Sequence, residues 1–246
     1  MTGVWGRRAR DWADLAEPEN AALFEAVHAE LAIGPGTRVL DVGCGSGLAA
    51  SMAATRGAAV TGIDNEPELL AIARERTPIV TFVDASMDET FPFPGDAFDV
   101  VTGFNAFQFA ADPAAAVREA GRVGNFVAAT TFAEPERVES TKLHLAMRSV
   151  RGDEPVAGYS PYSLSDAGGL EKLLTDAGLT PVTAGEVDVV WGHDDPELTI
   201  RAMLASAGGA LAIDAVGEAR VRAVLAPLVG EPMNNVFRYA IGRSPQ

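Results

Sequence analysis

Three glycines and one acid in the segment Val39-Leu-Asp-Val-Gly-Cys-Gly-Ser-Gly47 have the types and spacing of a ligand-binding turn. Gly43, Gly45 and Gly47 lie between a short apolar stretch and an alanine-rich one, as in a turn from a strand to a helix. Such a turn lets the backbone approach a ligand closely and points free helix N–H groups at it. Asp41 precedes the first glycine by two residues, and its carboxylate suits a ligand that carries an ammonium group.

A dinucleotide-binding turn is the first alternative. Its fingerprint requires glycines at 43, 45 and 48, but position 48 is Leu48. Asp41 would also crowd a pyrophosphate. These two residues disfavour an NAD(P)-dependent oxidoreductase, which remains a rival hypothesis.

The run Asp-Val-Gly-Cys-Gly-Ser-Gly resembles, position by position, the first motif of the class I S-adenosylmethionine-dependent methyltransferases. The resemblance implies S-adenosylmethionine as the cofactor. It also implies that the following residues contact this cofactor: Asp41, Gly43, Cys44, Gly45 and Gly47.

Acids and a polar turn at later strand ends extend the resemblance. Asp64, followed by Asn65, stands where the family uses an acid to hold both ribose hydroxyls, and a carboxylate accepts two hydrogen bonds readily. The resemblance further implies that Asp84, with Ala85 and Ser86, receives the adenine amino group. Phe104 and Asn105 follow a fourth strand, near the methionine part of the cofactor. The carboxyl ends of successive parallel strands form one crevice, so these residues are expected to meet there.

The segments at either end resemble the ubiquinone-biosynthesis-like branch (methyltransferase type 11), which methylates small molecules. Trp5-Gly-Arg-Arg-Ala-Arg-Asp-Trp12 resembles a segment that folds over the cofactor, whose carboxylate Arg7 or Arg10 could bind. Asn235-Val-Phe-Arg-Tyr239 resembles the last strand. The chain departs from the branch before strand five, where Arg122-Val-Gly-Asn-Phe126 is about four residues shorter than the usual turn.

Several of these residues have purely structural alternatives. Asp41 could cap the following turn, Asp64 could be the N-cap of the helix at 66–76, and Asp84 could begin a polar loop. We interpret Cys44 as a small packing residue. Trp5 could equally anchor the N-terminal helix.

His144 is the one candidate catalytic residue, because it lies in an insertion that tends to cover the acceptor in this family. We expect no metal, because the carboxylates and the Asp-Asn pair of metal-dependent members are not visible. The motif of amino-directed nucleic-acid methyltransferases is also missing, since its position reads Phe104-Asn-Ala-Phe107.

The elements that must position these residues alternate between strands and helices, which predicts a parallel sheet covered on both faces. We predict an α/β fold: a Rossmann-like, seven-stranded, mostly parallel sheet with an antiparallel last strand and helical insertions. Strands are predicted at 37–42, 58–63, 79–83, 97–102, 125–131, 182–191 and 235–242, and helices at 19–32, 47–56, 66–76, 113–122, 136–150 and 165–177, with two more helices in 196–230 separated at Gly208-Gly209.

We expect a single methyltransferase domain over 1–246. Its parts are N-terminal cap helices at 1–36, a cofactor-binding core at 37–133, a lid insertion at 134–165 and a second helical insertion at 192–232. The second insertion could also be a dimer contact.

The composition limits the classes of partner that the protein can bind. With 19 Lys and Arg against 34 Asp and Glu, the chain carries a formal charge of −15, which repels nucleic acid and anionic lipid. One cysteine allows no intramolecular disulfide. The chain has no apolar stretch of 18 residues and no leader-like segment, so we expect a cytoplasmic protein with a small-molecule acceptor and no nucleic-acid or membrane partner. A homodimer is a candidate assembly.

The sequence therefore predicts S-adenosylmethionine-dependent methyl transfer to O, N or C of a small molecule. The rivals are an S-adenosylmethionine-binding regulatory protein that does not transfer, and the oxidoreductase.

Overall fold

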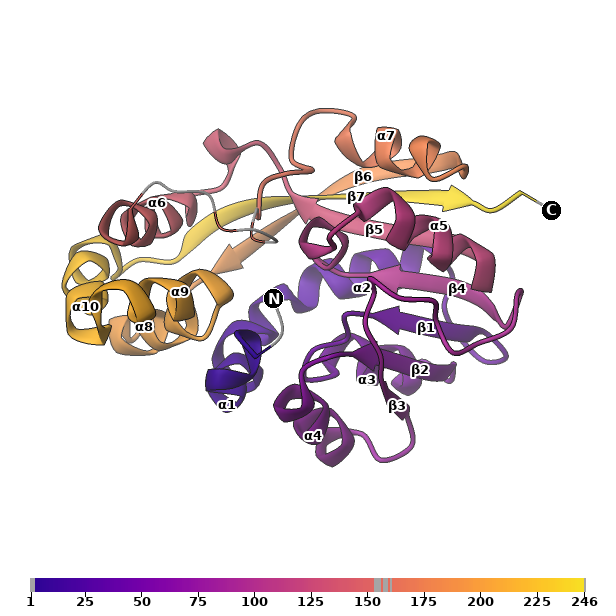
Figure 1. Ribbon diagram of the computed structural model, residues 1–246, viewed down its shortest axis with the longest axis horizontal. Helices are drawn as coiled ribbons and strands as arrows, with labels where there is room; N and C mark the ends of the chain where they lie inside the picture. Colours follow the sequence, from indigo (N-terminus) through magenta and orange to yellow (C-terminus); the bar gives the residue numbers. More distant parts are fainter. Residues whose placement is uncertain (1–2, 153–155, 157–158, 160, 246) are drawn as a thin grey trace.

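Seven strands form one sheet in the order β3-β2-β1-β4-β5-β7-β6 (Figure 1). The structure is a computed structural model and describes residues 3–152, 156, 159 and 161–245. The strands are β1 (Arg38–Val42), β2 (Ala59–Asp64), β3 (Thr81–Asp84), β4 (Phe98–Gly103), β5 (Gly124–Phe132), β6 (Thr180–Trp191) and β7 (Met233–Arg243). β7 is antiparallel to both of its neighbours, whereas β1 to β5 pair in parallel. The predicted α/β, mostly parallel sheet with an antiparallel last strand is confirmed.

Helices cover both faces of the sheet (Figure 1). The helices α2 (Ala21–Glu30), α3 (Leu48–Thr55) and α4 (Pro67–Arg76) pack on one face, and α5 (Pro113–Val123) and α7 (Gly169–Asp176) on the other. Alternate side chains of β1 enter the two layers: Leu40 and Val42 pack with α5, while Val39 packs with α3. This burial on both faces explains why the central strand reads as an almost continuous apolar run.

A second helical cluster lies beyond the end of β6 and β7. It contains α6 (Thr141–Arg151), α8 (Pro196–Leu204), α9 (Ala207–Val216) and α10 (Glu218–Leu225). Their apolar side chains form a core of their own, which also takes in Trp191 and Met233 from the strand ends. The connection from β6 to β7 thus forms three helices, where two were predicted.

The predicted helix break at Gly208-Gly209 is wrong. The break lies at Ala205-Ser206, because the Ser206 hydroxyl accepts a hydrogen bond from the Gly209 N–H and caps α9. The glycines instead allow close packing. A Cβ on Gly208 would lie 2.3 Å from the Tyr159 hydroxyl, and one on Gly209 would lie 2.5 Å from the Met203 carbonyl oxygen.

The predicted helix at 136–150 begins later than expected, at Thr141. Residues Pro135–Arg137 form only a short 3₁₀ turn, and Val138 bridges to Asn235 of β7. Pairing with a strand keeps this backbone extended, which periodicity in the sequence alone does not reveal. Of the 134–165 insertion, residues 153–155, 157–158 and 160 lie outside the described residues.

The chain order along the sheet reverses between β1 and β4, and this is where a ligand crevice opens in doubly wound folds. The turn after β1 passes over this point. The N–H groups of Gly43 and Cys44 both donate to the Ile63 carbonyl oxygen, at 2.9 and 3.0 Å, which ties the turn to β2. Gly47 then begins α3 in a left-handed conformation, with φ of 81°.

Among the described residues, no single helix is both long and apolar enough to cross a membrane. The helices α8 and α9 meet that length and composition only as a pair, and they are bent by 86°.

Gly47→Ala tests how tightly this turn is packed. The new Cβ would lie 2.8 Å from Ala73 Cβ and 3.0 Å from Phe82 Cζ, in a conformation that alanine rarely adopts. We expect a loss of about 3 kcal/mol in the free energy of unfolding, measured by urea denaturation, from overpacking added to left-handed strain. The matched control is Gly178→Ala, with φ of 88° and no atom within 4 Å, for which about 1 kcal/mol is expected from strain alone. Equal losses would show that close packing does not require a glycine at position 47.

Candidate functional site

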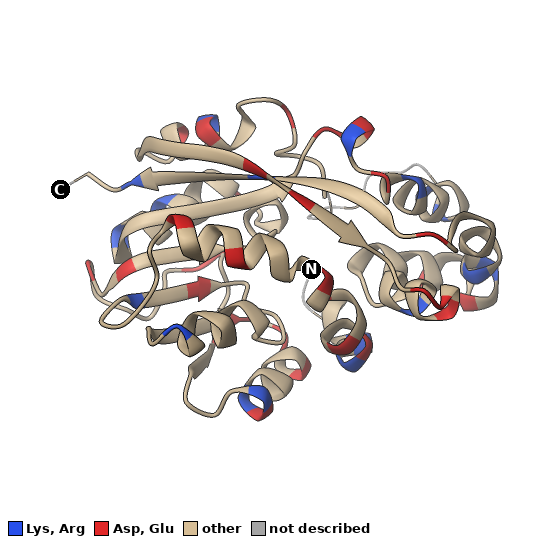
Figure 2. Ribbon diagram, turned by 180° about the vertical axis from the view of Figure 1, so that it is seen from behind, with Lys and Arg blue, Asp and Glu red and all other residues tan. Residues whose placement is uncertain are grey.

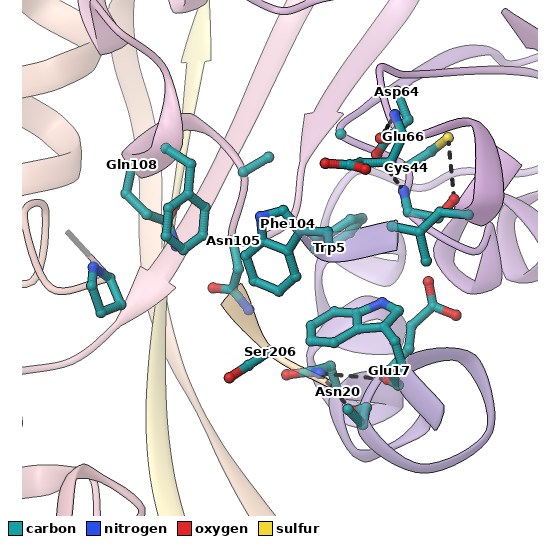
Figure 3. A pocket seen from close by; sticks show the side chains of 18 of the residues that line it. Trp5, Glu17, Asn20, Cys44, Asp64, Glu66, Phe104, Asn105, Gln108 and Ser206 are labelled. Carbon is teal, nitrogen blue, oxygen red and sulfur yellow. Dashed lines mark hydrogen bonds between the residues drawn. The ribbon is translucent and has the colours of Figure 1, made fainter. Parts of the chain in front are cut away.

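One large pocket opens at the carboxyl ends of the strands, between the glycine turn, the N-terminal segment and the second helical cluster (Figure 3). Its volume of about 220 Å³ is many times the 10–15 Å³ that a water molecule needs on the same measure. The pocket therefore has room for a ligand much larger than water.

Most of the predicted site residues line this pocket. From the cofactor set they are Asp41, Gly43, Cys44, Gly45, Asp64, Asn65, Ser86, Phe104 and Asn105, and the candidate catalytic His144 lines it too. Their individual roles stay predictions.

Gly47, Asp84 and Ala85 do not line the pocket. Gly47 faces Ala73 of α4, so its lack of a side chain serves helix packing. Asp84 is exposed at the end of β3, where it pairs in register with Asp64. The Ala85 N–H donates to the Asp64 carbonyl oxygen, which continues this pairing by one residue.

Asp41 is buried at the end of β1, directly beside Thr102 of β4. The Thr102 hydroxyl donates to its carboxylate at 2.8 Å, and no backbone N–H of the turn does so among the described bonds. Burial, together with the negative charges of Glu17 and Asp64, raises the pKa of Asp41 to about 7. A cationic ligand would relieve this unfavourable charge.

Asp64 accepts hydrogen bonds from two backbone N–H groups, that of Gly45 at 2.8 Å and that of Glu66 at 2.9 Å. It therefore holds the glycine turn as well as facing the pocket. Burial raises its pKa to about 6 despite these bonds. The N-cap of α4 is Glu66, so the interpretation of Asp64 as that cap is wrong.

Glu17 is a pocket residue that the sequence did not reveal. Its carboxylate accepts hydrogen bonds from the Ser46 hydroxyl and from Arg76, which also donates to the Ser46 and Ala13 carbonyl oxygens, each at 2.9 Å. Burial raises the pKa of Glu17. Because its partners lie about 30 and 60 positions away, no local pattern marks this residue.

The N-terminal segment, which includes α1 (Ala9–Asp11), forms one wall of the pocket. The Glu66 carboxylate accepts the N–H groups of Gly3 and Gly6, at 2.6 and 3.2 Å. Trp5 packs edge-to-face on Trp12 and on Phe109, with centroid distances of 4.9 and 5.4 Å. The two tryptophans therefore anchor the segment and also line the pocket.

The arginines of this segment point elsewhere. Arg7 pairs with Asp214 of α9 at 2.5 Å, and Arg10 pairs with Glu75 of α4 at 2.9 Å. Figure 2 shows basic and acidic residues next to one another on these helices. Neither arginine lines the pocket, so the structure does not support the expectation that one of them binds the cofactor carboxylate.

The turn after β4 carries Phe104 and Asn105 into the pocket (Figure 3). Asn105 has φ of 48°, a conformation that asparagine tolerates, and its N–H donates to the Thr130 hydroxyl at 2.9 Å. Gly103 makes this tight turn possible, because a Cβ there would lie 2.3 Å from the Phe107 ring.

His144 lies at the far end of the pocket, on α6. Its Nδ1 is 2.7 Å from the Tyr162 hydroxyl, which is 2.9 Å from the Thr141 hydroxyl. Burial lowers the pKa of His144 to about 4, so the imidazole is neutral near pH 7. A neutral imidazole with one nitrogen already bonded can accept a proton only through the other.

Cys44 is buried in the glycine turn. Burial raises the pKa of the Cys44 thiol, which agrees with its interpretation as a packing residue and not a nucleophile.

Within the described ranges, no group of three His, Cys, Asp or Glu side chains could hold a metal ion.

Comparison with known proteins agrees with this geometry. Residues 40–125 match the family model described as a methyltransferase domain. This match implies S-adenosylmethionine as the cofactor.

A relative from Xanthomonas campestris, named a ubiquinone biosynthesis O-methyltransferase, is 36% identical over 120 residues. The match covers 45% of this chain and 50% of that relative. The chain thus matches about half the length of this curated relative.

Two solved structures share the fold over most of the chain. A putative methyltransferase from Haloferax volcanii, in complex with the Trm112 methyltransferase activator, has a TM-score of 0.61 at 21% identity and covers 98% of this chain and 96% of its own. The [4+2]-cyclase SpnF has a TM-score of 0.59 at 22% identity and covers 91% and 80%. At these identities the likeness concerns the fold.

The raised pKa values of Asp41 and Asp64 predict pH-dependent binding. Between about pH 4 and 7 the folded apoprotein holds protons that the unfolded chain has released, so these two groups stabilise the fold less as pH rises. A ligand whose ammonium group faces these carboxylates needs their ionised forms, so its binding has the opposite trend. We expect the affinity for S-adenosylhomocysteine to rise about tenfold from pH 5.5 to 8, measured by calorimetry, with proton release below pH 7 detected in buffers of different ionisation enthalpy.

Asp41→Asn serves as the comparison variant. It should bind more weakly at pH 8 and lose the part of the pH dependence that lies near pH 7. An unchanged pH profile in this variant would show that Asp41 does not face the cationic group.

Proposed function

We propose that this protein binds S-adenosylmethionine in the pocket and transfers its methyl group to a small-molecule acceptor. One observation carries the proposal: within the residues that match the methyltransferase-domain model, the glycine turn, the buried Asp41 carboxylate and the half-buried Asp64 carboxylate converge on one pocket. Bound there, S-adenosylmethionine supplies an activated methyl group on a sulfonium.

The residues present fit this cofactor. Asp41 would face its ammonium group, and Asp64 would accept the ribose hydroxyls. Ser86 would lie toward the adenine, with Asp84 and Ala85 next to it but outside the pocket lining, and Phe104 and Asn105 would lie toward the methionine part. The pKa values raised by burial and by neighbouring carboxylates are those expected where a cationic ligand restores the charge balance.

The chain mainly needs to align two molecules and exclude water, because the methyl donor is already activated. The N-terminal segment does this on one side through Trp5 and Trp12. On the other side we propose that the 134–165 insertion, in its described part, is the acceptor lid, because His144 reaches the pocket from α6. The acceptor could be methylated at O, N or C.

We propose His144 as the group that takes a proton from a hydroxyl acceptor. If Tyr162 donates to Thr141 and accepts the Nδ1–H of His144, then His144 Nε2 has a free lone pair. Burial of the imidazole keeps it neutral over the physiological range. Tyr162 would then be a positioning residue that fixes the tautomer.

His144→Ala should lower kcat about 100-fold with a hydroxyl acceptor and leave the S-adenosylhomocysteine affinity unchanged. Tyr162→Phe keeps the ring but removes the hydroxyl, and we expect a smaller loss in kcat, about threefold to tenfold, with KM unchanged. Steady-state kinetics with each variant provides both values. Full activity of His144→Ala would remove this residue from the mechanism.

Parallel thermal-shift assays with S-adenosylhomocysteine and NADH test the cofactor. We expect micromolar binding of the former, on the order of −8 kcal/mol, and none of comparable strength for NADH. A preference for NADH would overturn the proposal and favour the oxidoreductase.

Turnover must be measured separately from binding. One structural neighbour is named a [4+2]-cyclase, so we keep binding without transfer as a second candidate. A protein that binds S-adenosylhomocysteine but forms none from S-adenosylmethionine across a broad panel of hydroxyl, amine and carbon acceptors would match that candidate.

The proposal also covers the class of acceptor, the cellular location and the assembly of the protein. The charge of −15 favours a small-molecule acceptor over nucleic acid. We propose a cytoplasmic location, and a homodimer through the 192–232 insertion, which size-exclusion chromatography with light scattering would test.

A further inference from the structure

Gln108 is a buried pocket residue whose amide has no partner. Its side chain is 4% exposed and lines the pocket, and neither Oε1 nor Nε2 has a hydrogen-bond partner among the described residues. A buried amide normally makes several hydrogen bonds, since it has two donors and two acceptor sites. An amide left unpaired beside a cavity indicates a partner that the cavity receives.

The position of Gln108 is tightly defined. It is the middle residue of the 3₁₀ turn Phe107–Phe109, which Gly103 holds against β4 through the buried Phe107 ring. On its C-terminal side, the Phe109 ring stacks on Tyr159 of the 134–165 insertion, with centroids 6.1 Å apart. Gln108 is therefore part of a packed wall.

Gln108 lies toward the acceptor end of the pocket. In Figure 3 it is on the opposite side of Trp5 from Asp64 and Cys44, the residues of the cofactor end. The stacking of Phe109 on Tyr159 also joins its turn to the insertion that carries His144. We therefore expect the methyl-acceptor molecule, and not the adenosine part of the cofactor, to reach Gln108.

Charge is distributed unevenly around the pocket. Among its described lining residues there is no lysine or arginine, whereas five acids line it: Glu17, Asp41, Asp64, Glu66 and Asp88. Arg76 reaches Glu17 from behind but does not itself line the pocket. An anionic acceptor would therefore be buried without a counter-charge, which is strongly unfavourable.

Apolar and aromatic side chains form much of the remaining lining, together with the polar Ser140, Ser206 and Asn235. Phe109, Phe132, Tyr159, Trp191 and Met203 come from five different elements or turns and face the same pocket. Such walls bind a flat or apolar body, while a few polar groups fix its orientation.

We infer that Gln108 is a specificity-determining residue that binds an uncharged methyl-acceptor molecule. This molecule has an apolar body and carries a hydrogen-bond donor next to a hydrogen-bond acceptor. The amide pairs with both groups, and the absence of Lys and Arg from the described lining residues excludes the carboxylate or phosphate form of the same molecule. This inference rests on the proposed function, since it names the class of acceptor for the same site.

The first test concerns the unpaired amide and needs no acceptor. Gln108→Leu has a similar volume and removes both polar atoms. We expect the variant without ligand to melt about 2–4 °C higher than the natural protein, because the unpaired amide is removed. Thr131→Val is the matched control: the Thr131 hydroxyl is also buried and unpartnered but does not line the pocket.

The second test uses two probes that differ in charge. In the presence of saturating S-adenosylhomocysteine, calorimetry compares 2-hydroxybenzamide, which is neutral, with 2-hydroxybenzoate, its anionic counterpart. We expect at least tenfold tighter binding of the amide, a loss of that binding in Gln108→Leu, and its retention in Thr131→Val. Affinity for S-adenosylhomocysteine should stay within threefold in both variants.

The outcomes separate the inference from the proposed function. Failure of S-adenosylhomocysteine to bind the natural protein would overturn the proposed function itself. Equal binding of the two probes, or unchanged binding in Gln108→Leu, would overturn the inference alone. If neither probe binds, melting decides: a Gln108→Leu variant that melts below the natural protein shows that the amide is bonded within the fold, and overturns the inference.

Discussion

The burial of Asp41 and Asp64 at adjoining strand ends is the constraint around which the site is arranged. Asp41 is buried and Asp64 is half-buried, and hydrogen bonds from Thr102 and from the Gly45 and Glu66 N–H groups compensate for only part of their lost solvation. The negative charge of Asp64 raises the pKa of Asp41, and that of Glu66 raises the pKa of Asp64. The fold tolerates this because the glycine turn, which Asp64 itself holds, leaves the two groups facing a cavity that can receive a cation.

The N-terminal segment depends on the same end of the sheet. Arg76 fixes it from α4 by bonding to the Glu17 carboxylate and the Ala13 carbonyl oxygen, and it bonds to the glycine turn at Ser46 as well. One guanidinium, always charged, thus joins three parts of the chain. Movement of the segment away from the pocket would leave Glu17 and Arg76 without each other, so opening is costly and a closed wall is the stable arrangement.

The sheet and the cofactor end were predictable from the sequence because their signals are local. The glycine turn, the acids at strand ends and the alternation of elements lie within short windows, and the structure brings most of those residues to one pocket. Glu17 and Gln108 were not predictable, because burial and the partners that a side chain has or lacks depend on distant segments. The predicted helix break at Gly208-Gly209 was wrong for the same reason. These glycines allow the helix to pack against Tyr159 and Met203 and do not end it.

The two ends of the pocket differ in their physical chemistry, and this difference has a consequence for the order of binding. At the cofactor end, carboxylates attract a cationic ligand over a distance; at the far end, a neutral imidazole and an unpaired amide act only on contact. A cation that enters first neutralises the carboxylates, which otherwise disfavour any electron-rich acceptor nearby. The arrangement of charges therefore favours the cofactor binding before the acceptor, with the acceptor completing the hydrogen bonds of a pocket whose charge is already balanced.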